Sequence, residues 1–297
     1  MTTWATYKNG NYFVDINLND GTKIRHNDLD FFAPEKPESM DLKITNWCNM
    51  GCPMCHENST PEGKHGNIMN MPFIDTLLPY TEIAIGGGDP LSHPHLVPFL
   101  EKLKSRNLVA NMTVNQIGFM DNIDFIQGLI DKKLIYGLGV SLVDANDEFI
   151  DAISKFPNAV IHVINGIITM DQLRSMAHRN LKILILGYKE FRRGKSLFER
   201  QNVEINHLKS AFYDMLPTVI EEEWFKVVSF DNLAIKQLDP KRLMGDEEYN
   251  KFFMGTDGEY TMYVDAVNWE FAQSSTSTKR YGLRDNIKDM FDIVRNK

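Results

Sequence analysis

Between residue 40 and about residue 230, the chain repeats one pattern of hydrophobic and polar positions. Short apolar runs rich in β-branched residues alternate with longer amphipathic windows, as at 96–104, where one apolar stripe holds Leu96, Phe99, Leu100 and Leu103. The short runs predict strands at residues 41–45, 82–85, 110–114, 137–142, 160–164 and 182–186. Six strand–helix units favour a parallel sheet with right-handed crossovers, curled into a partial (β/α)6 TIM-like barrel.

The pattern changes on both sides of this region. Residues 11–18 and 22–25 alternate as two strands joined by Asn19-Asp20-Gly21, which predicts a β-hairpin. Near the C-terminus, residues 257–266 indicate another hairpin, and an amphipathic helix follows. We therefore expect an α/β protein with an N-terminal β-hairpin extension (1–38), a partial barrel (39–230) and a C-terminal α/β cap over the barrel mouth (231–297).

Composition narrows the class of protein. With 43% hydrophobic and 24% charged residues in 297, the chain can bury a sizeable core. A net charge of −8 argues against binding duplex nucleic acid, and the basic runs 192–195 and 279–280 are typical of solvated surface. No apolar run approaches the roughly 20 residues of a membrane span. Residues 1–10 lack the profile of a secretory signal, so we expect a cytoplasmic, reducing location.

All three cysteines of the chain, Cys48, Cys52 and Cys55, lie within eight residues, directly after the first predicted barrel strand. Three thiolates on one short loop can hold three corners of an iron–sulfur cluster and leave one iron without a protein ligand. The alternative is a structural zinc site, with His56 or His65 as the fourth ligand. A zinc-stabilised binding module without catalytic activity therefore remains open on the cysteines alone.

Polar and glycine residues follow the other predicted strands. In parallel α/β sheets, function lies at the carboxyl ends of the strands. The second strand runs into Gly86-Gly87-Gly88-Asp89, where consecutive glycines permit close backbone approach to a ligand and the acid can meet a cation. Later strands end near Asn115, Ser141, Asn165 and Gly187-Tyr188. Each of these taken singly is typical of a turn or a helix cap.

The cysteine spacing resembles the signature of the radical S-adenosylmethionine (radical SAM) enzymes, and the glycine–aspartate segment resembles their Gly-Gly-Glu-Pro motif. The resemblance covers roughly residues 40–190. It implies that the three cysteines bind a [4Fe–4S] cluster whose fourth iron is chelated by SAM. It also implies that SAM is bound by Gly86, Gly87, Gly88, Asp89, Asn115, Ser141, Asn165, Gly187 and Tyr188. The sequence departs from the family in having Asp89 for the usual Glu, an extra glycine before it, and Met54 where many members carry an aromatic residue.

The resemblance implies reductive cleavage of SAM to a 5′-deoxyadenosyl radical, which abstracts hydrogen from a substrate C–H bond. It also implies an oxygen-sensitive protein and an electron donor such as flavodoxin or ferredoxin. The C-terminal region resembles the auxiliary-cluster domain of peptide-modifying members without its ligands, since serines and threonines occupy 274–278 where cysteines are expected. A peptide or protein substrate is therefore favoured, and a nucleotide or other small metabolite is the alternative.

The absence of further cysteines excludes two reaction types. Neither an auxiliary cluster nor a cysteine hydrogen donor is available, which leaves Tyr188, Tyr260 and Tyr263 as candidate hydrogen donors by residue type. Two other features are expected to be structural. His93 and His95 have poor spacing for a metal pair, and the acidic run 221–223 is typical of a solvated helix start.

Overall fold

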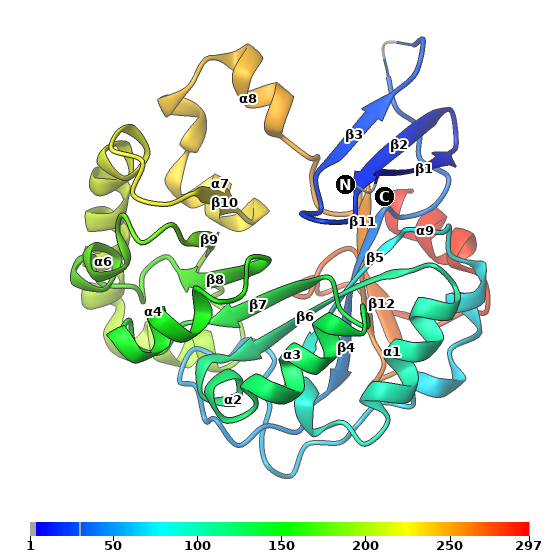
Figure 1. Ribbon diagram of the computed structural model, residues 1–297, viewed down its shortest axis with the longest axis horizontal. Coiled ribbons are helices and arrows are strands. Elements are labelled where there is room, and N and C mark those ends of the chain that lie inside the picture. The colour runs from blue at the N-terminus through cyan, green and yellow to red at the C-terminus, as the bar shows by residue number, and fades with distance from the viewer. Residues whose placement is uncertain (1–3, 30, 297) are drawn as a thin grey trace.

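The computed structural model describes residues 4–29 and 31–296. Its centre is a ten-stranded sheet in the order β10-β9-β8-β7-β6-β5-β4-β11-β12-β13 (Figure 1). The strands from β4 to β10 and the neighbouring β11 are parallel, while β12 and β13 run antiparallel. Their bounds are β4 Ser39–Thr45, β5 Glu82–Gly87, β6 Val109–Asn115, β7 Gly137–Ser141, β8 Ala159–Ile164, β9 Lys182–Leu186, β10 Val227–Phe230, β11 Thr261–Asp265, β12 Glu270–Ala272 and β13 Tyr281–Gly282.

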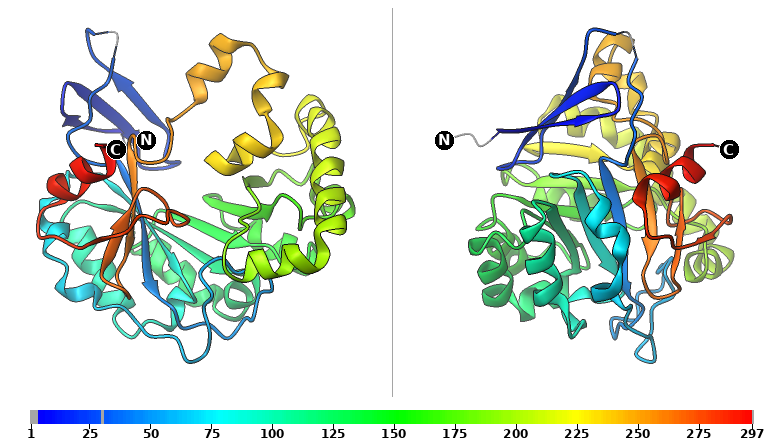
Figure 2. Two further views of the ribbon diagram at one scale, coloured as in Figure 1. Left: turned by 180° about the vertical axis from the view of Figure 1, so that it is seen from behind. Right: turned by 90° about the vertical axis from the view of Figure 1, so that its right-hand side faces the viewer.

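All six strands predicted from the sequence are present, within two residues at each end. Helices and short 3-10 turns connect them and cover the outer face of the sheet (Figures 1 and 2). The α-helices are α1 Leu96–Ser105, α2 Gln116–Asp121, α3 Ile123–Asp131, α4 Asp147–Ile153, α5 Met170–Met176, α6 Arg193–Glu221, α7 Asn232–Leu238, α8 Asp246–Phe252 and α9 Ile287–Arg295. The 3-10 helices are η1 Ile68–Asn70, η2 Pro72–Thr76, η3 Pro90–Ser92 and η4 Pro240–Leu243.

The two faces of the sheet differ in chemistry. The face under the helices carries the main core, to which β4 contributes Met40, Leu42 and Ile44. The opposite, inner face carries small and polar residues that solvent still reaches, namely Asp41, Ala84, Gly86, Asn111, Thr113, Asn115, Gly139, Ser141 and His162. Because successive side chains of a strand point to opposite faces, the period-two burial of these strands produces both surfaces. The inner face is therefore available to a ligand.

The N-terminal hairpin is part of a three-stranded antiparallel sheet of β1 Trp4–Asn9, β2 Tyr12–Asn17 and β3 Lys23–His26. The sequence interpretation missed β1, although the Gly10-Asn11 turn before Tyr12 is a hairpin signal. The hairpin tip lies against the amino ends of the parallel strands. Lys23 forms an ion pair with Glu82, and Asn158 Nδ2 donates to Asn19 O over 2.5 Å.

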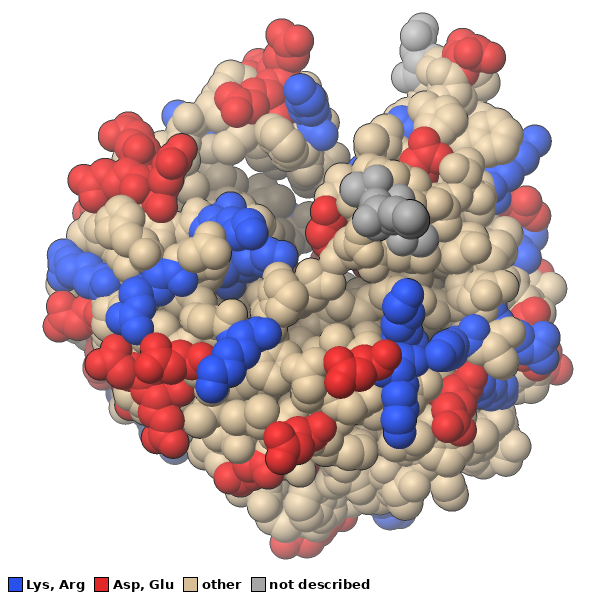
Figure 3. Space-filling model, in the orientation of Figure 1, with Lys and Arg blue, Asp and Glu red and all other residues tan. Residues whose placement is uncertain are grey.

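The C-terminal part, expected as a cap over the barrel mouth, shares the main sheet. β11 pairs with β4 from Thr261↔Ser39 to Asp265↔Lys43, so β11, β12 and β13 extend the main sheet. Only the segment with α7, η4 and α8 projects from it, and the surface between α8 and the N-terminal sheet is hollowed (Figures 1 and 3). The expectation about a secretory signal concerned residues 1–10. Residues 1–3 of that segment lie outside the described part of the chain.

The helices bear on two further expectations from the sequence, the acidic run at 221–223 and the lack of a membrane span. The acidic run at 221–223 follows the end of α6 and does not start a helix, so that prediction was wrong. Glu222 instead accepts a 2.8 Å hydrogen bond from the indole N–H of Trp224. Across the described residues, none of the helices is both long enough and apolar enough to cross a membrane.

Candidate functional site

The cysteine loop, residues 46–67, leaves β4 and lies along the carboxyl end of β5. Gly88 N–H donates to Thr45 O over 2.7 Å, and Asp89 N–H donates to Trp47 O over 2.8 Å. A Cβ at Gly88 would lie 2.1 Å from Trp47 O, which is far inside contact distance. The glycine is therefore required by the close packing of two backbones, a role that the sequence interpretation did not assign to it.

The neighbouring glycines have different surroundings. Gly87 has φ +116°, a conformation that L side chains rarely adopt, and its Cβ would lie 2.5 Å from Thr45 O. A Cβ at Gly86 would meet nothing within 4 Å, because that residue faces open space on the inner face. Of the three glycines, Gly86 is thus the one whose missing side chain leaves room for a ligand.

The three thiols are free and half-buried. Burial raises the pKa of Cys48 and Cys52, and for Cys52 the sulfurs of Cys55 and Cys48 add to the shift. The sulfurs therefore lie close enough to influence one another's pKa. Asn115 Nδ2 lies 3.8 Å from Cys52 Sγ, which brings the end of β6 to the same place. Since thiols with raised pKa are protonated at neutral pH, loading a metal here releases protons.

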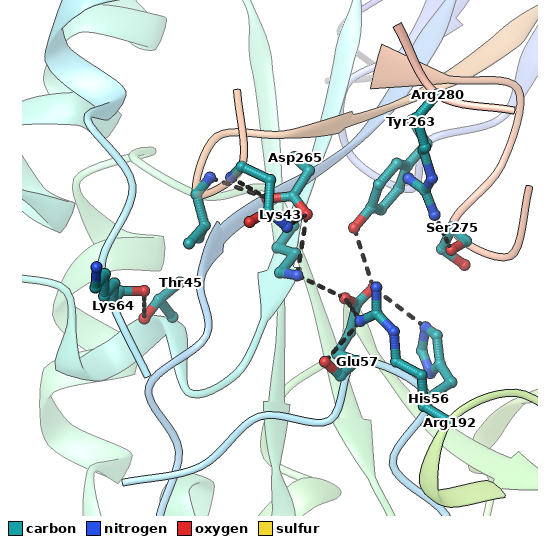
Figure 4. Close-up of polar contacts among 12 residues, drawn as sticks. Lys43, Thr45, His56, Glu57, Lys64, Arg192, Tyr263, Asp265, Ser275 and Arg280 are labelled. Atoms are coloured by element: carbon teal, nitrogen blue, oxygen red, sulfur yellow. Dashed lines mark hydrogen bonds and ion pairs between the residues drawn. The ribbon is translucent and has the colours of Figure 1, made fainter. Parts of the chain in front are cut away.

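A buried network of charged residues joins the cysteine loop to the sheet (Figure 4). Lys43, with its side chain 1% exposed, lies 2.9 Å from Glu57 Oε2 and 3.0 Å from Asp265 Oδ2. Glu57 also accepts a 3.1 Å hydrogen bond from the Tyr263 hydroxyl and lies 3.4 Å from Arg192 Nη1. Sequence analysis missed this network, although lysine in an apolar strand was a signal.

Glu57 is the centre of that network. Burial alone would raise its pKa, but the contacts with His56, Lys43 and Arg192 outweigh burial and hold the pKa below its ordinary value. The carboxylate is therefore ionised at neutral pH. Glu57 thus fixes the residues just after Cys55 to Lys43 of β4, to Tyr263 of β11 and to Arg192, which precedes α6.

A small pocket lies between the cysteine loop and the ends of β8 and β9. It is lined by Met54, His56, Ile164, Leu186, Gly187, Tyr188 and Lys189. The Tyr188 ring does not face it freely, because the hydroxyl donates to Gly194 O over 2.7 Å and the side chain is buried against Phe198. The ring of Tyr188 is therefore neither a stacking surface nor an accessible hydrogen donor. Its backbone N–H donates to Gln237 Oε1 over 2.9 Å, and its carbonyl accepts from Gln237 Nε2 over 3.0 Å.

The other predicted ligand-binding residues lie at the carboxyl ends of their strands, and most already have local partners. Asp89 Oδ1 accepts from Leu91 N–H over 3.1 Å, and Asn115 Oδ1 accepts from Ile117 N–H over 2.9 Å, so both cap short helices. Asn165 is fully buried and donates to Gln237 Oε1 over 3.0 Å, while its own Oδ1 has no partner among the described residues. Ser141 lies on the inner face, between Asn115 and His162 in register.

The remaining tyrosine candidates lie in different places. Tyr263 is beside the cysteine loop, through its bond to Glu57. Tyr260 is at the opposite end of the sheet, where its carbonyl accepts from Glu38 N–H and its ring lies 3.6 Å from the Arg25 guanidinium carbon. Tyr260 is therefore remote from the cysteines, and its candidacy as a hydrogen donor is not supported.

The histidines proposed for a zinc site have other partners. His65 Nδ1 lies 2.9 Å from Thr45 Oγ1, and His56 Nε2 lies 3.5 Å from Glu57. His93 uses both ring nitrogens, one with Gly66 O and one with His95 N–H. Within 4–29 and 31–296, no three His, Cys, Asp or Glu side chains converge on a point that could hold a single metal ion.

The donor set fits a cluster better than it fits a single ion. A cluster is held by thiolates on separate irons, so three sulfurs around it need not converge on one point. Five buried side-chain polar atoms of the described residues have no partner, and three of them lie in or against the cysteine loop: Asn46 Oδ1, Ser59 Oγ and Arg193 Nε. Such atoms are expected where a bound group completes a site.

Comparisons with known proteins agree with this geometry. No family model matches the chain. The chain is 30% identical over 142 residues to a probable GTP 3′,8-cyclase of Methanocaldococcus jannaschii, a match that covers 43% of this chain and 44% of that protein. The chain thus spans less than half the length of that relative.

The fold is that of Streptococcus suis SuiB. The crystal structure of SuiB bound to the precursor peptide SuiA matches with a TM-score of 0.64 and 11% identity, over 98% of this chain and 88% of that one. The structure bound to S-adenosylmethionine matches with a TM-score of 0.60 and 9% identity, over 98% and 87%. At these identities the likeness concerns the fold. The partial sequence match and the cysteine loop at the rim of the sheet agree with the resemblance to the radical SAM enzymes described above.

Proposed function

We propose that this protein is a radical SAM enzyme that binds a [4Fe–4S] cluster through Cys48, Cys52 and Cys55 and modifies a C–H bond of a peptide or protein. The observation that carries the proposal is one juxtaposition. Three thiols that influence one another's pKa lie on a loop that packs against a glycine segment, and the inner side of that segment, at Gly86, is open to a ligand. In this proposal the sheet forms a partial (β/α)6 barrel. Its inner face then holds the substrate.

When bound, the cluster and SAM supply an electron to a sulfur–carbon bond and a radical that abstracts hydrogen from the substrate. The chain's own residues would hold and orient these groups. Gly86 would allow close backbone approach of the ligand, while Gly87 and Gly88 would hold the segment against the cysteine loop. Asp89 would present a carboxylate beside them, and the pocket at Gly187 and Tyr188 would accept a flat group. The α7–α8 segment and the N-terminal sheet would limit access of water to the inner face.

A peptide substrate is supported by the match to SuiB with bound SuiA over almost the whole chain. The GTP 3′,8-cyclase match favours a nucleotide instead, but it covers under half of either chain. The charges on the inner face also support a peptide. Asp41, Asp231, Asp257 and Glu57 lie close enough to influence one another there, so a triphosphate would meet several like charges.

The cluster is tested by anaerobic purification and metal analysis of the wild type and of Cys52→Ala. We expect a brown protein with about four irons and four sulfides per chain, lost in Cys52→Ala. The exposed Glu62, on the same loop, offers a matched control, because Glu62→Ala should retain both. A colourless wild type that contains zinc would support the structural zinc module.

Catalysis is tested separately, by adding dithionite and SAM to the loaded protein. We expect 5′-deoxyadenosine from the wild type and from Glu62→Ala, and none from Cys52→Ala. If the loaded wild type releases no 5′-deoxyadenosine, the catalytic proposal fails even though the cluster is present.

A further inference from the structure

The basic run at 192–195 was expected to lie on solvated surface, but its first two residues contact the cysteine loop. Arg192 precedes α6 with a φ of +52°, a conformation that L residues rarely adopt, and its Nη1 donates to Glu57 O over 2.7 Å (Figure 4). Arg193, the first residue of α6, also reaches the loop. Lys195 is exposed. The expectation is therefore wrong for the two arginines and correct for Lys195.

Two hydrogen bonds connect the Arg193 side chain to the backbone of Cys48. Arg193 Nη2 donates to Ser59 O over 2.7 Å, and the carbonyl of the next residue, Thr60, accepts from Cys48 N–H over 2.9 Å. The guanidinium therefore lies against the segment of the loop that pairs with the first cysteine. Burial raises the pKa of Cys48 and Cys52, and Arg193 opposes that rise, as a cation near both sulfurs does.

The positive charge of Arg193 has no negative partner in the chain. Its neighbour Arg192 lies 3.4 Å from the Glu57 carboxylate. Across the described part of the chain, Arg193 pairs with no carboxylate, and its Nε is buried without a hydrogen-bond partner. Ser59 Oγ, on the residue that Arg193 contacts, is also buried without a partner. A cation withdrawn from water without a counter-charge is unfavourable, so these atoms indicate that an anionic group bound at the loop completes the site.

The cluster of the proposed function has the required charge. An oxidised, doubly positive [4Fe–4S] core with three thiolate ligands carries one net negative charge, and reduction by one electron adds a second. A fixed cation nearby stabilises the more negative state more strongly, and partial burial limits the screening of that attraction by water.

We propose that Arg193 raises the reduction potential of the cluster by holding an unpaired positive charge against the cysteine loop. The inference rests on the proposed function, because it concerns the cluster that the three cysteines would bind. Arg193 acts through its charge and through its contact with Ser59, so it is a positioning residue and not a catalytic one. The consequence is that an electron donor of a given potential reduces a larger fraction of the protein.

The test is an anaerobic redox titration of the cluster-loaded full chain without SAM, in which electron paramagnetic resonance measures the reduced cluster. At a given potential, Arg193→Gln should lower the ratio of reduced to oxidised cluster at least about tenfold, which is about 59 mV for a one-electron couple. Arg193→Lys keeps the charge and should stay within about threefold of the wild type. The matched control is Lys195→Gln in the same basic run, where loss of an exposed charge should change the ratio less than about twofold.

Iron analysis and thermal melts separate this role from a purely structural one. Arg193→Gln and a second neutral variant, Arg193→Met, should both retain about four irons per chain. Methionine keeps much of the apolar stem that packs against the loop. The proposal is overturned if the neutral variants titrate within about twofold of the wild type, or if Arg193→Lys loses as much as Arg193→Gln. It is also overturned if both neutral variants lose their iron, because Arg193 would then only hold the loop.

Formation of 5′-deoxyadenosine separates this inference from the proposed function. If the loaded wild type forms it and the neutral variants keep the wild-type potential, the Arg193 assignment alone fails. If the potential falls as expected but the wild type forms no 5′-deoxyadenosine, the Arg193 assignment stands and the catalytic proposal fails. A wild type that binds zinc in place of the cluster overturns both.

Discussion

At the scale of single residues, Lys43 has the largest structural role of the polar side chains near the site. It is buried on β4 between Glu57 and Asp265, which lie far away in sequence. Breaking a buried ion pair by removing one partner leaves the other charge uncompensated. The network is therefore expected to hold the cysteine loop in place, and only the curled sheet brings its members together.

Replacing Lys43 tests this role. Lys43→Met should lower the free energy of unfolding by about 3–5 kcal/mol, because Asp265 stays buried without its cation and Glu57 keeps only Arg192. Chemical denaturation under anaerobic conditions measures the loss. The matched control is Lys64→Met on the same loop, where the side chain is exposed and little change is expected. Equal stability of the two variants would contradict the assigned role.

His162 and Asp41, both on the inner face, are expected to make folding stability depend on pH in opposite directions. Burial lowers the pKa of His162 to about 4, below its unfolded value of 6.5, so the unfolded chain binds the proton first. Stability is therefore lost as pH falls from 6.5 to 4, by up to about 3 kcal/mol. The pKa of Asp41 is raised from its ordinary value of 3.8 to about 6, so the folded state binds the proton more tightly than the unfolded chain does. Stability therefore falls as pH rises from 3.8 to 6.

Single variants separate these two contributions. We expect His162→Gln to flatten the loss of stability between pH 6.5 and 4, and Asp41→Asn to raise stability at pH 7 more than at pH 4. Denaturation curves at pH 4, 5, 6 and 7 measure both. If both variants follow the wild-type pH profile, the inner face is less enclosed than its geometry indicates.

At the scale of elements, the cysteine loop and the end of β5 can pack this closely only because residue 88 is a glycine. Gly88 has no room for a Cβ beside Trp47 O, whereas Gly86 has open space. A substitution at Gly88 must displace one backbone, and the cysteines move with it. The same substitution at Gly86 enters only the space proposed for SAM.

These two glycines form a matched pair for mutation. Gly88→Ala should lower the iron content after reconstitution and destabilise the fold by about 1–3 kcal/mol through overpacking. Gly86→Ala should retain iron and stability but bind SAM more weakly. Iron analysis, thermal melts and SAM titration distinguish the cases. Normal iron content in Gly88→Ala would show that the loop is not held by this contact.

At the scale of the whole molecule, Arg25 joins three parts of the chain. From β3 it donates to both carboxylate oxygens of the buried Glu38, over 2.7 and 3.0 Å, and to Met254 O over 3.2 Å. Its guanidinium also lies over the Tyr260 ring. The N-terminal sheet, the start of β4 and the segment after α8 therefore meet at one side chain.

We expect Arg25→Leu to loosen all three parts at once. Hydrogen exchange should become faster in both 4–26 and 252–260, because Glu38 loses its partner and Met254 O its donor. Hydrogen-exchange mass spectrometry measures the effect, with Arg174→Leu on exposed α5 as the control. Faster exchange in only one of the two segments would mean that they are held independently.

The sequence predicts those parts of the fold that depend on residues close together in the chain, and it misses those that depend on distant residues. Period-two alternation and turn residues are local, so the six barrel strands, the β2–β3 hairpin and the position of the cysteine loop followed from the sequence. The short β10 was missed, because its four residues, Val227–Phe230, give little periodicity. The pairing of β11 with β4 was not predicted, since no local pattern says which strand β11 joins.

By itself, the sequence determined that three thiols sit on one loop at the carboxyl end of the first barrel strand, because spacing and strand order are properties of the chain. Tertiary structure alone decided which side chains surround that loop. Lys43 and Asp265 are 222 residues apart and meet because β11 pairs with β4. Tyr188 turns its ring away from the pocket because Gly194 O, at the start of α6, accepts its hydroxyl. Acids from three segments, Glu57, Asp231 and Asp257, come near Asp41 because the sheet curls, and curling depends on packing over the whole molecule.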